Sequence, residues 1–246
     1  MFKLILSDFE RISKDLKHWI LVLLMAFGIT ALISFGMILT GSTTSSKYLE
    51  GFTGSSIISG IAVGVFELST VFGADQKAKI YPALIGSGLP RWKVITAKFL
   101  IFAILSLIDL LLMGAAGYMI ADLYQISLGG IYTLRFVRFL VMVWLFIITA
   151  CVPAALVFFL TDKVILMLGV YIPLMVGLAT QALNTVGNSL GINLLPILDV
   201  RYHAVRCISF IAGGAFNLIS ILYVVVYMTV LLLVTAKVFE NKELNF

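Results

Sequence analysis

Residues 74–98 read ADQKAKIYPALIGSGLPRWKVITAK, the longest stretch of this chain that cannot lie in lipid. The stretch joins two long apolar segments and carries five Lys and Arg residues. An apolar centre, a Gly-Ser-Gly break at residues 86–88 and the following Pro90 predict a short amphipathic helix, a glycine stop and a basic restart into the next helix. We expect this helix to lie against one face of a membrane protein, where it suits docking to a soluble partner.

The residues expected to carry that docking lie in or beside the predicted helix and its turn, within a loop spanning residues 74–93. They are Asp75, Lys77, Lys79, Ile80, Tyr81, Leu84, Ile85, Gly88, Pro90 and Arg91.

The composition is that of an integral membrane protein. Of the 246 residues, 61% are hydrophobic and 12% are charged, and the mean hydropathy is +1.12. About a quarter of the residues are charged in a soluble domain. The net charge of +5 does not indicate a nucleic-acid partner, because the basic residues gather at the ends of apolar segments. We expect one membrane domain, residues 1–246, in contact with lipid.

Six apolar segments each have about the 20 residues that a helix needs to cross the hydrocarbon core. Before the first of them, residues 1–18 place apolar side chains at three- and four-residue steps with charges opposite, which predicts an amphipathic helix lying in the membrane interface. The predicted spans are residues 19–39, 52–73, 94–121, 136–160, 164–183 and 214–236.

The distribution of positive charge predicts the orientation. With the amino terminus inside, all but five of the 17 Lys and Arg residues fall on the inner side, as the positive-inside rule requires. Both termini and the loop of residues 74–93 are therefore expected in the cytoplasm. The five residues expected outside are Lys47, Arg135, Arg138, Arg201 and Arg206.

Residues 184–213 are too polar to span cleanly and too apolar to lie free in water. We interpret them as extracellular re-entrant helices shielded by protein. Two further spans would instead place Arg201 and Arg206 in lipid, at about 2.5–3.5 kcal/mol each at mid-bilayer. The predicted fold is an all-α membrane protein of six transmembrane helices, with an interfacial first helix, a cytoplasmic helix after the second span and re-entrant helices before the sixth.

Two groups of residues within the spans are candidates for a role of their own. Glu67 and Asp109 are acids at membrane depth, where such residues face a bundle interior or water. They serve either as polar anchors between helices or in ion coupling, and Glu67 is close enough to the basic loop to reach its lysines. Ser56, Gly60 and Gly64 form a small-residue seam, which packs against another subunit or within the chain.

Enzymatic motifs are missing from the sequence. There is no HExxH, no GxxxxGK[ST] phosphate loop and no pairing of a serine with a histidine, and the two histidines are too few for a metal site. We therefore expect neither an enzyme nor a cofactor in this chain. If its activity requires ATP, hydrolysis takes place in another chain.

The arrangement resembles the permease subunits of ABC exporters of the ABC-2 type, over nearly the whole chain. The local match is an acidic residue after the second span, a small-Gly-x-x-Arg turn and a Lys entering the third span, here Asp75, Ser87 to Arg91, and Lys98. The sequence departs from the family at Lys79-Ile80, where Gly-Thr is common. Small relatives without a fused ATPase export, or confer immunity to, lantibiotic and other amphipathic peptides.

The resemblance implies a separate ABC ATPase subunit that binds ATP and Mg, a second permease copy or a paralogue, and a bacterial plasma membrane. The implied function is export of a hydrophobic or amphipathic substrate such as a peptide toxin. Two alternatives remain open. An ion-coupled secondary transporter or channel using Glu67 and Asp109 would work without a partner. A non-transporting immunity protein would bind its ligand without any dependence on nucleotide.

Overall fold

The computed structural model describes residues 2–39, 44–78, 80–86, 88–212 and 214–241. Within these ranges every regular element is a helix, which confirms the all-α class. The helices are α1 (Phe2–Ser13), α2 (Leu16–Leu39), α3 (Ser45–Leu68), the π-helix η1 (Ser69–Gly73), α4 (Ala74–Lys77), α5 (Ile80–Gly86), α6 (Arg91–Leu123), α7 (Ile131–Thr161), α8 (Val164–Val176), α9 (Leu178–Leu190), α10 (Leu195–Leu198), α11 (Val200–Cys207), the 3-10 helix η2 (Ser209–Ala212) and α12 (Leu218–Asn241).

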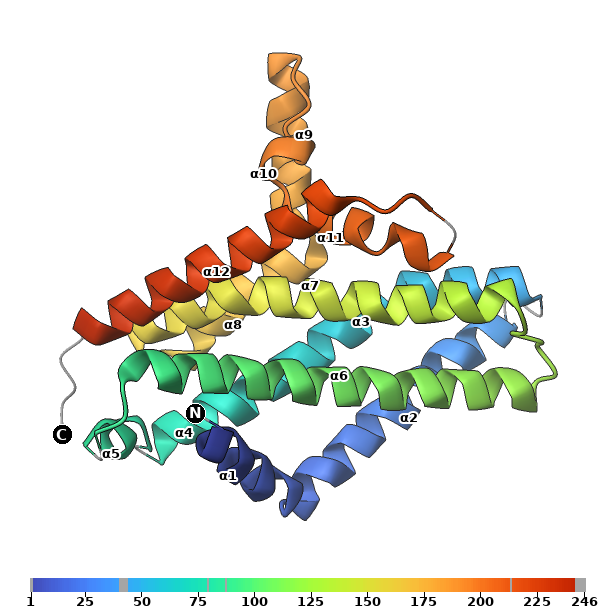
Figure 1. Ribbon diagram of the computed structural model, residues 1–246. Coiled ribbons are helices and arrows are strands. Elements are labelled where there is room, and N and C mark those ends of the chain that lie inside the picture. The colour runs from blue at the N-terminus through green and yellow to red at the C-terminus, as the bar shows by residue number, and fades with distance from the viewer. Residues whose placement is uncertain (1, 40–43, 79, 87, 213, 242–246) are drawn as a thin grey trace.

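The protein is membrane-embedded, because several of its long helices are apolar enough to cross a bilayer. Five of those described are long and apolar enough to cross a bilayer, and a sixth is obtained if α8 and α9 count as one broken span. In Figure 1, α4, α5, the start of α6 and the end of α12 gather at one end of the bundle, here called the α5 end. The turn between α6 and α7 lies at the opposite end.

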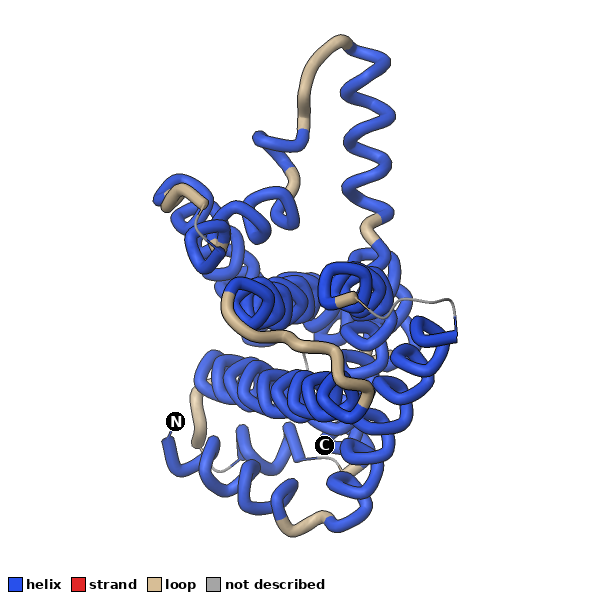
Figure 2. The backbone as a smooth tube through the Cα atoms, turned by 90° about the vertical axis from the view of Figure 1, so that its right-hand side faces the viewer, coloured by secondary structure: helices blue, strands red, loops and turns tan. Residues whose placement is uncertain are grey.

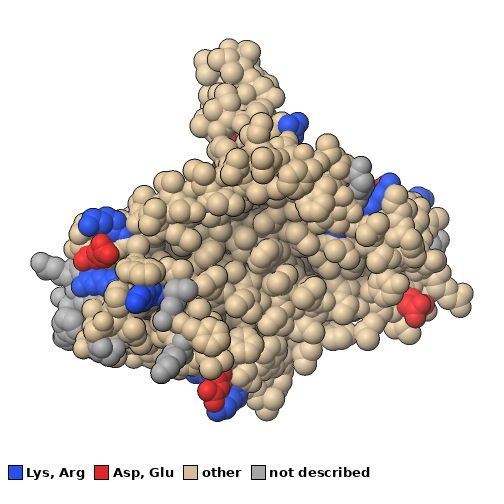
Figure 3. Space-filling view, in the orientation of Figure 1, with Lys and Arg blue, Asp and Glu red and all other residues tan. Residues whose placement is uncertain are grey.

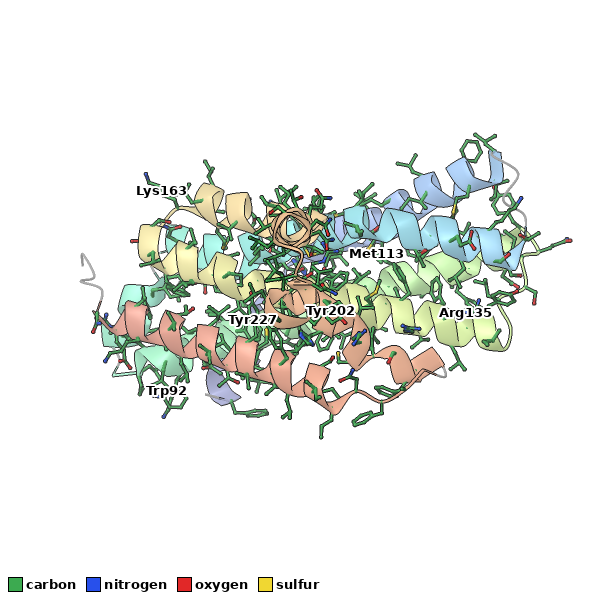
Figure 4. The ribbon with its side chains drawn as sticks, turned by 90° about the horizontal axis from the view of Figure 1, so that it is seen from above. Trp92, Met113, Arg135, Lys163, Tyr202 and Tyr227 are labelled. Carbon is green, nitrogen blue, oxygen red and sulfur yellow. The ribbon has the colours of Figure 1, made fainter. Side chains whose placement is uncertain are left out.

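Charged side chains lie mainly at the two ends of the bundle. On the face shown in Figure 3, most Lys, Arg, Asp and Glu residues cluster at the left and right ends, and the surface between them is almost entirely uncharged. In the view from above, Trp92 and Lys163 lie at the α5 end and Arg135 at the opposite end (Figure 4). A belt of uncharged surface between two charged ends is the pattern expected of a protein that crosses lipid.

The amphipathic amino-terminal segment is shorter than the predicted residues 1–18. Helix α1 ends at Ser13, and α2 begins at Leu16, so that the two helices form a V in Figure 1. Asp15 fixes the turn, because its Oδ1 accepts hydrogen bonds from the backbone N–H of Lys17 (3.0 Å) and of His18 (3.4 Å). His18 therefore belongs to the first candidate span, where its side chain is buried.

The fifth predicted span, residues 164–183, differs from the structure. Helix α8 stops at Val176, Gly177 takes a positive φ of 87°, and α9 continues at 58° to α8. A Cβ atom on Gly177 would lie 2.2 Å from Nη1 of Arg201, so the guanidinium occupies the space that a side chain would need. The break is therefore at Gly177, four residues after Pro173, and α9 with α10 stands away from the bundle in Figures 1 and 2.

The second candidate span does not end as a plain α-helix. Between α3 and α4, η1 is five residues of π-helix, Ser69–Gly73. The hydroxyls of Ser69 and Thr70 donate to the carbonyl oxygens of Val65 and Phe66, at 2.8 and 3.0 Å. A π-helix inserts a residue into the α-helical register and is frequent at functional sites. Here it separates Glu67 from Asp75.

Candidate functional site

Four charged side chains meet at the α5 end of the bundle, and we call them the ion cluster: Asp8, Arg11, Asp75 and Lys98. Lys98 Nζ lies 2.5 Å from Asp8 Oδ2 and forms a second ion pair with Asp75. Arg11 Nη1 lies 2.8 Å from Asp75 Oδ1, and Arg11 Nη2 lies 3.7 Å from Asp8 Oδ1. Asp75 and Lys98 are fully buried, and Asp8 is 7% exposed.

The ion cluster brings together residues from three helices that are far apart in the chain. Asp8 and Arg11 are three residues apart on one face of α1, Asp75 is in the first turn of α4, and Lys98 is on α6 two turns after its start. Two acids and two bases balance to zero net charge, which is the condition for burying ions at tolerable cost. The cluster therefore ties the amino-terminal helix and the segment after the second span to the start of the third.

Helix α5 is anchored by an aromatic residue rather than lying loosely on the surface. Tyr81 is buried, and its ring lies 6.3, 5.7 and 6.1 Å from the rings of Phe158, Phe159 and Phe239, at the ends of α7 and α12. Burial first, and the carboxylates of the ion cluster second, raise the pKa of the Tyr81 hydroxyl well above its usual value. Tyr81 is thus a neutral anchor, and it leaves Ala83 on the exposed side of α5.

The turn from α5 into α6 follows the glycine and proline signals of the sequence. Gly88 has a positive φ of 85°, and its N–H donates to the Ile85 carbonyl at 2.9 Å, which closes the end of α5. Pro90 is extended (ψ 133°) and directly precedes α6.

Arg91 joins the start of α6 to the end of α12. Its Nη1 donates to the backbone oxygens of Phe239 (2.5 Å) and Glu240 (2.9 Å), and its guanidinium lies 5.5 Å from the centre of the Phe239 ring. A cation at the carboxyl end of a helix satisfies its last carbonyls and opposes its dipole. Gln76 adds a tie from α4, because its side-chain nitrogen donates to the carbonyl of Asp162 between α7 and α8.

The remaining predicted docking residues lie around this framework. Ile80, Leu84 and Ile85 are on α5 and are half-buried; the last two pack against the hydrophobic core. Lys77 is the last residue of α4, and Lys79 lies outside the described residues.

The two membrane-depth acids come together, and a third group joins them. Glu67 on α3 and Asp109 on α6 are buried, and their carboxyl groups are close enough to act on each other electrostatically. Nε2 of His18, on α2, is 3.5 Å from Glu67 Oε1. We call these three residues the inner site. The sequence allows Glu67 to reach Lys77, Lys79 or water, and in the structure it lies against His18 and Asp109.

The small-residue seam packs inside the chain. A Cβ on Gly64 would lie 1.7 Å from the Tyr171 hydroxyl oxygen, and a Cβ on Gly60 would lie 2.8 Å from Val143 Cγ1. The Tyr171 hydroxyl also donates to the Gly60 carbonyl oxygen at 2.9 Å. These glycines therefore let α7 and α8 approach α3 closely, as small residues do in membrane helices. Ser56 is on the same helix.

The sequence does not single out Asp8, Arg11 or His18 as members of a site. Its pattern groups Asp8 and Arg11 with the polar face of the first helix, and His18 with the interface. One feature of the sequence could have indicated the two sites. Lys98 and Asp109 are eleven residues apart, which is three helical turns, so they lie on one face of α6. Within the described residues, no group of three His, Cys, Asp or Glu side chains is arranged to hold a metal ion.

Comparison of the chain with protein-family models, with curated proteins and with solved structures found no match. The function is therefore argued from the geometry of the ion cluster, the α5 anchor and the inner site.

Proposed function

We propose that this chain is the membrane permease subunit of an ATP-driven exporter, and that a separate ATPase docks on α5 and drives it. The observation that carries the proposal is the buried ion cluster, which joins α4 to α1 and to α6. In this proposal the α5 end faces the cytoplasm, as the positive-inside count predicts.

Force applied to α5 has defined paths into the membrane. Tyr81 carries it to the ends of α7 and α12, and Arg91 holds α12 to the start of α6. The ion cluster carries it from α4 to α1 and α6. Packed interfaces of this kind switch between discrete arrangements rather than deform continuously, which is what a coupling element needs.

The surface left for the ATPase is small and exposed. Ala83 and Gly86 on α5 are exposed, and no atom lies within 4 Å of a Cβ placed on Gly86. Trp92, 47% exposed, and the half-exposed Lys93 follow at the start of α6. Exposed tryptophan side chains are enriched among the anchors of protein interfaces.

The proposal is tested by purifying the tagged chain from its native membrane and measuring bound ATPase activity. Gly86→Arg adds a long side chain to the docking surface without a clash in the chain itself, so we expect the ATPase to be lost. Gly129→Arg is the matched control, because Gly129 is an exposed glycine between α6 and α7 at the opposite end. Absence of any ATPase from the wild-type complex, or its full retention in Gly86→Arg, would contradict the proposal.

The substrate we propose is a hydrophobic or amphipathic molecule such as a peptide toxin. The support is the largely uncharged surface between the ends of the bundle on the face shown in Figure 3, which suits an apolar substrate better than a hydrophilic polymer. A strain that lacks the chain should become sensitive to amphipathic peptides, and the chain supplied in trans should restore resistance. Equal sensitivity of the two strains would remove this assignment.

A further inference from the structure

The inner site is built of three titratable side chains with nothing else to pair with. His18 is 3% exposed, Glu67 is fully buried and Asp109 is 2% exposed. Apart from their contacts with one another, their side-chain nitrogen and oxygen atoms have no hydrogen-bond partner among the described residues. Buried polar atoms are rarely left in this state, because each one costs about 1–3 kcal/mol.

The surroundings of the inner site supply no compensating charge. The His18 ring stacks on Phe66 with centroids 5.0 Å apart and meets the edge of Trp19 at 5.4 Å. No described Lys or Arg forms an ion pair with His18, Glu67 or Asp109, and the nearby Asp15, which accepts from the His18 backbone N–H, is an acid. Fully deprotonated, the site would carry two negative charges and a neutral imidazole in a water-poor interior, where unpaired ions are strongly disfavoured.

Charge neutrality therefore requires two protons among the three groups. One arrangement is a protonated imidazole facing Glu67, with the second proton shared between the two carboxyl groups. The other is a neutral imidazole beside two carboxylic acids. In both arrangements at least one carboxyl group is protonated. Two carboxyl groups in contact behave as a coupled pair, so the second proton belongs to the pair rather than to one residue.

We propose that His18, Glu67 and Asp109 form an intramembrane proton-binding site, which holds two protons at neutral pH. The site unites α2, α3 and α6. It is independent of the proposed export function, because it depends only on groups within this chain.

The π-helix η1 lies between Glu67 of the proton-binding site and Asp75 of the ion cluster. Glu67 comes two residues before the π-helix and Asp75 comes two residues after it. One residue more or less in a helix rotates the residues after it by about 100°. Glu67 and Asp75 meet their respective partners in the register that η1 sets, so a conversion of η1 to α-helix would disengage one of them. η1 therefore fixes the register between the proton-binding site and the ion cluster.

The test is infrared spectroscopy of the purified chain in lipid at neutral pH, without ATPase, nucleotide or substrate. Wild type should show the carbonyl stretch of a protonated carboxylic acid, shifted on exchange into D₂O. The double variant Glu67→Gln/Asp109→Asn is nearly isosteric and should lose the band completely. The matched control Glu50→Gln/Asp122→Asn changes exposed acids on the same two helices and should keep it.

Absence of the band from wild type, or its persistence in the Glu67→Gln/Asp109→Asn variant, would overturn the proposal. If the double variant does not fold, ¹⁵N NMR of His18 in a His203→Gln background keeps the test decisive, because His18 is then the only histidine. An imidazolium or a neutral imidazole at neutral pH supports the site when the acid band is also present. Either form of the imidazole without the band overturns it. The infrared and NMR results are independent of ATPase binding. The proton-binding site can be refuted while an ATPase still binds α5, and ATPase binding can be refuted while the proton-binding site stands.

Discussion

The ion cluster and the inner site use the same parts of the chain and balance charge differently. Both sites draw residues from the α1–α2 segment, from the helix that runs from α3 to α4, and from α6. Along α6 they are about 16 Å apart, from the rise of 1.5 Å per residue. The ion cluster pairs two acids with two permanent cations. The inner site has two acids and one histidine, so it needs protons where the cluster needs none.

We call the ion cluster a clamp, because its charges are permanently paired, and the inner site a switch, because its charge depends on bound protons. Removing one member of a balanced, buried set strands an ion of opposite charge, so the ion cluster should be sensitive to every change at its buried members. Neutralising an acid in the inner site removes a charge that had no permanent partner, so stability should hardly change. Variants at the two sites and in the helix between them test this difference.

The largest effect is expected from inserting one alanine after Thr70, within η1. The π-helix already accommodates one extra residue, so a second one rotates Asp75 by about 100° relative to Glu67, and one of the two sites loses its partner on this helix. We expect a loss of about 5 kcal/mol or more, or failure to fold. Denaturant unfolding in detergent measures it, with an alanine inserted after Gly129 in the turn between α6 and α7 as the control. Equal stability of the two insertion variants would show that the register set by η1 is unimportant.

Lys98→Met should destabilise the protein by about 3–5 kcal/mol, because it leaves Asp8 and Asp75 buried with Arg11 alone. Lys93→Met, five residues earlier on α6 and half-exposed, is the matched control and should change stability by less than about 0.5 kcal/mol. Adding Asp75→Asn to Lys98→Met should restore part of the loss, since it removes the stranded carboxylate. A double variant as unstable as the sum of the singles would contradict the clamp.

Arg11→Gln should cost about 1 kcal/mol, less than Lys98→Met. The Arg11 side chain is 40% exposed, so water already screens its ion pair with Asp75. High salt should weaken the wild-type protein toward the variant, because exposed pairs are screened by ions. Chemical unfolding at low and high salt gives both quantities. A loss as large as that of Lys98→Met would mean that the cluster depends on Arg11 as a buried member.

The smallest effect is expected at the inner site. Asp109→Asn should change the free energy of unfolding by less than about 0.5 kcal/mol or raise it, because the variant removes one of two unbalanced acids at nearly constant shape. Asp75→Asn is the counterpart in the ion cluster and should be clearly destabilising. A reversed order of these two variants would remove the distinction between clamp and switch.

The sequence predicted the all-α membrane class, and the segments that it marked as apolar are mostly helical, although the fifth is broken at Gly177 and the helix of the sixth begins at Leu218. It also predicted a short helix after the second span and the turn at Gly88, because glycine and proline signals are local. The ion cluster was not predicted, since the pairing of Lys98 with Asp8 joins residues 90 apart in the chain. The periodicity of apolar residues within either segment does not predict a contact between the two segments.

The break at Gly177 shows a second limit. The apolar run over residues 164–183 predicts one span, with a kink at Pro173. The observed break depends on the positive φ of Gly177 and on Arg201, which lies 24 positions later and stacks on Phe146 at 4.3 Å. Hydropathy reports neither a dihedral angle nor a side chain that arrives from another helix.

The proposed function requires that a separate ATPase binds α5. A photo-reactive amino acid introduced at Ala83, on the exposed side of α5, and activated in living cells tests this contact directly. We expect a crosslinked adduct with a nucleotide-binding protein, and none when the same probe replaces Gly129 at the opposite end. An adduct at Gly129 but none at Ala83, or modification of an Ala83→Cys variant by thiol reagents confined to the extracellular side, would contradict the proposal.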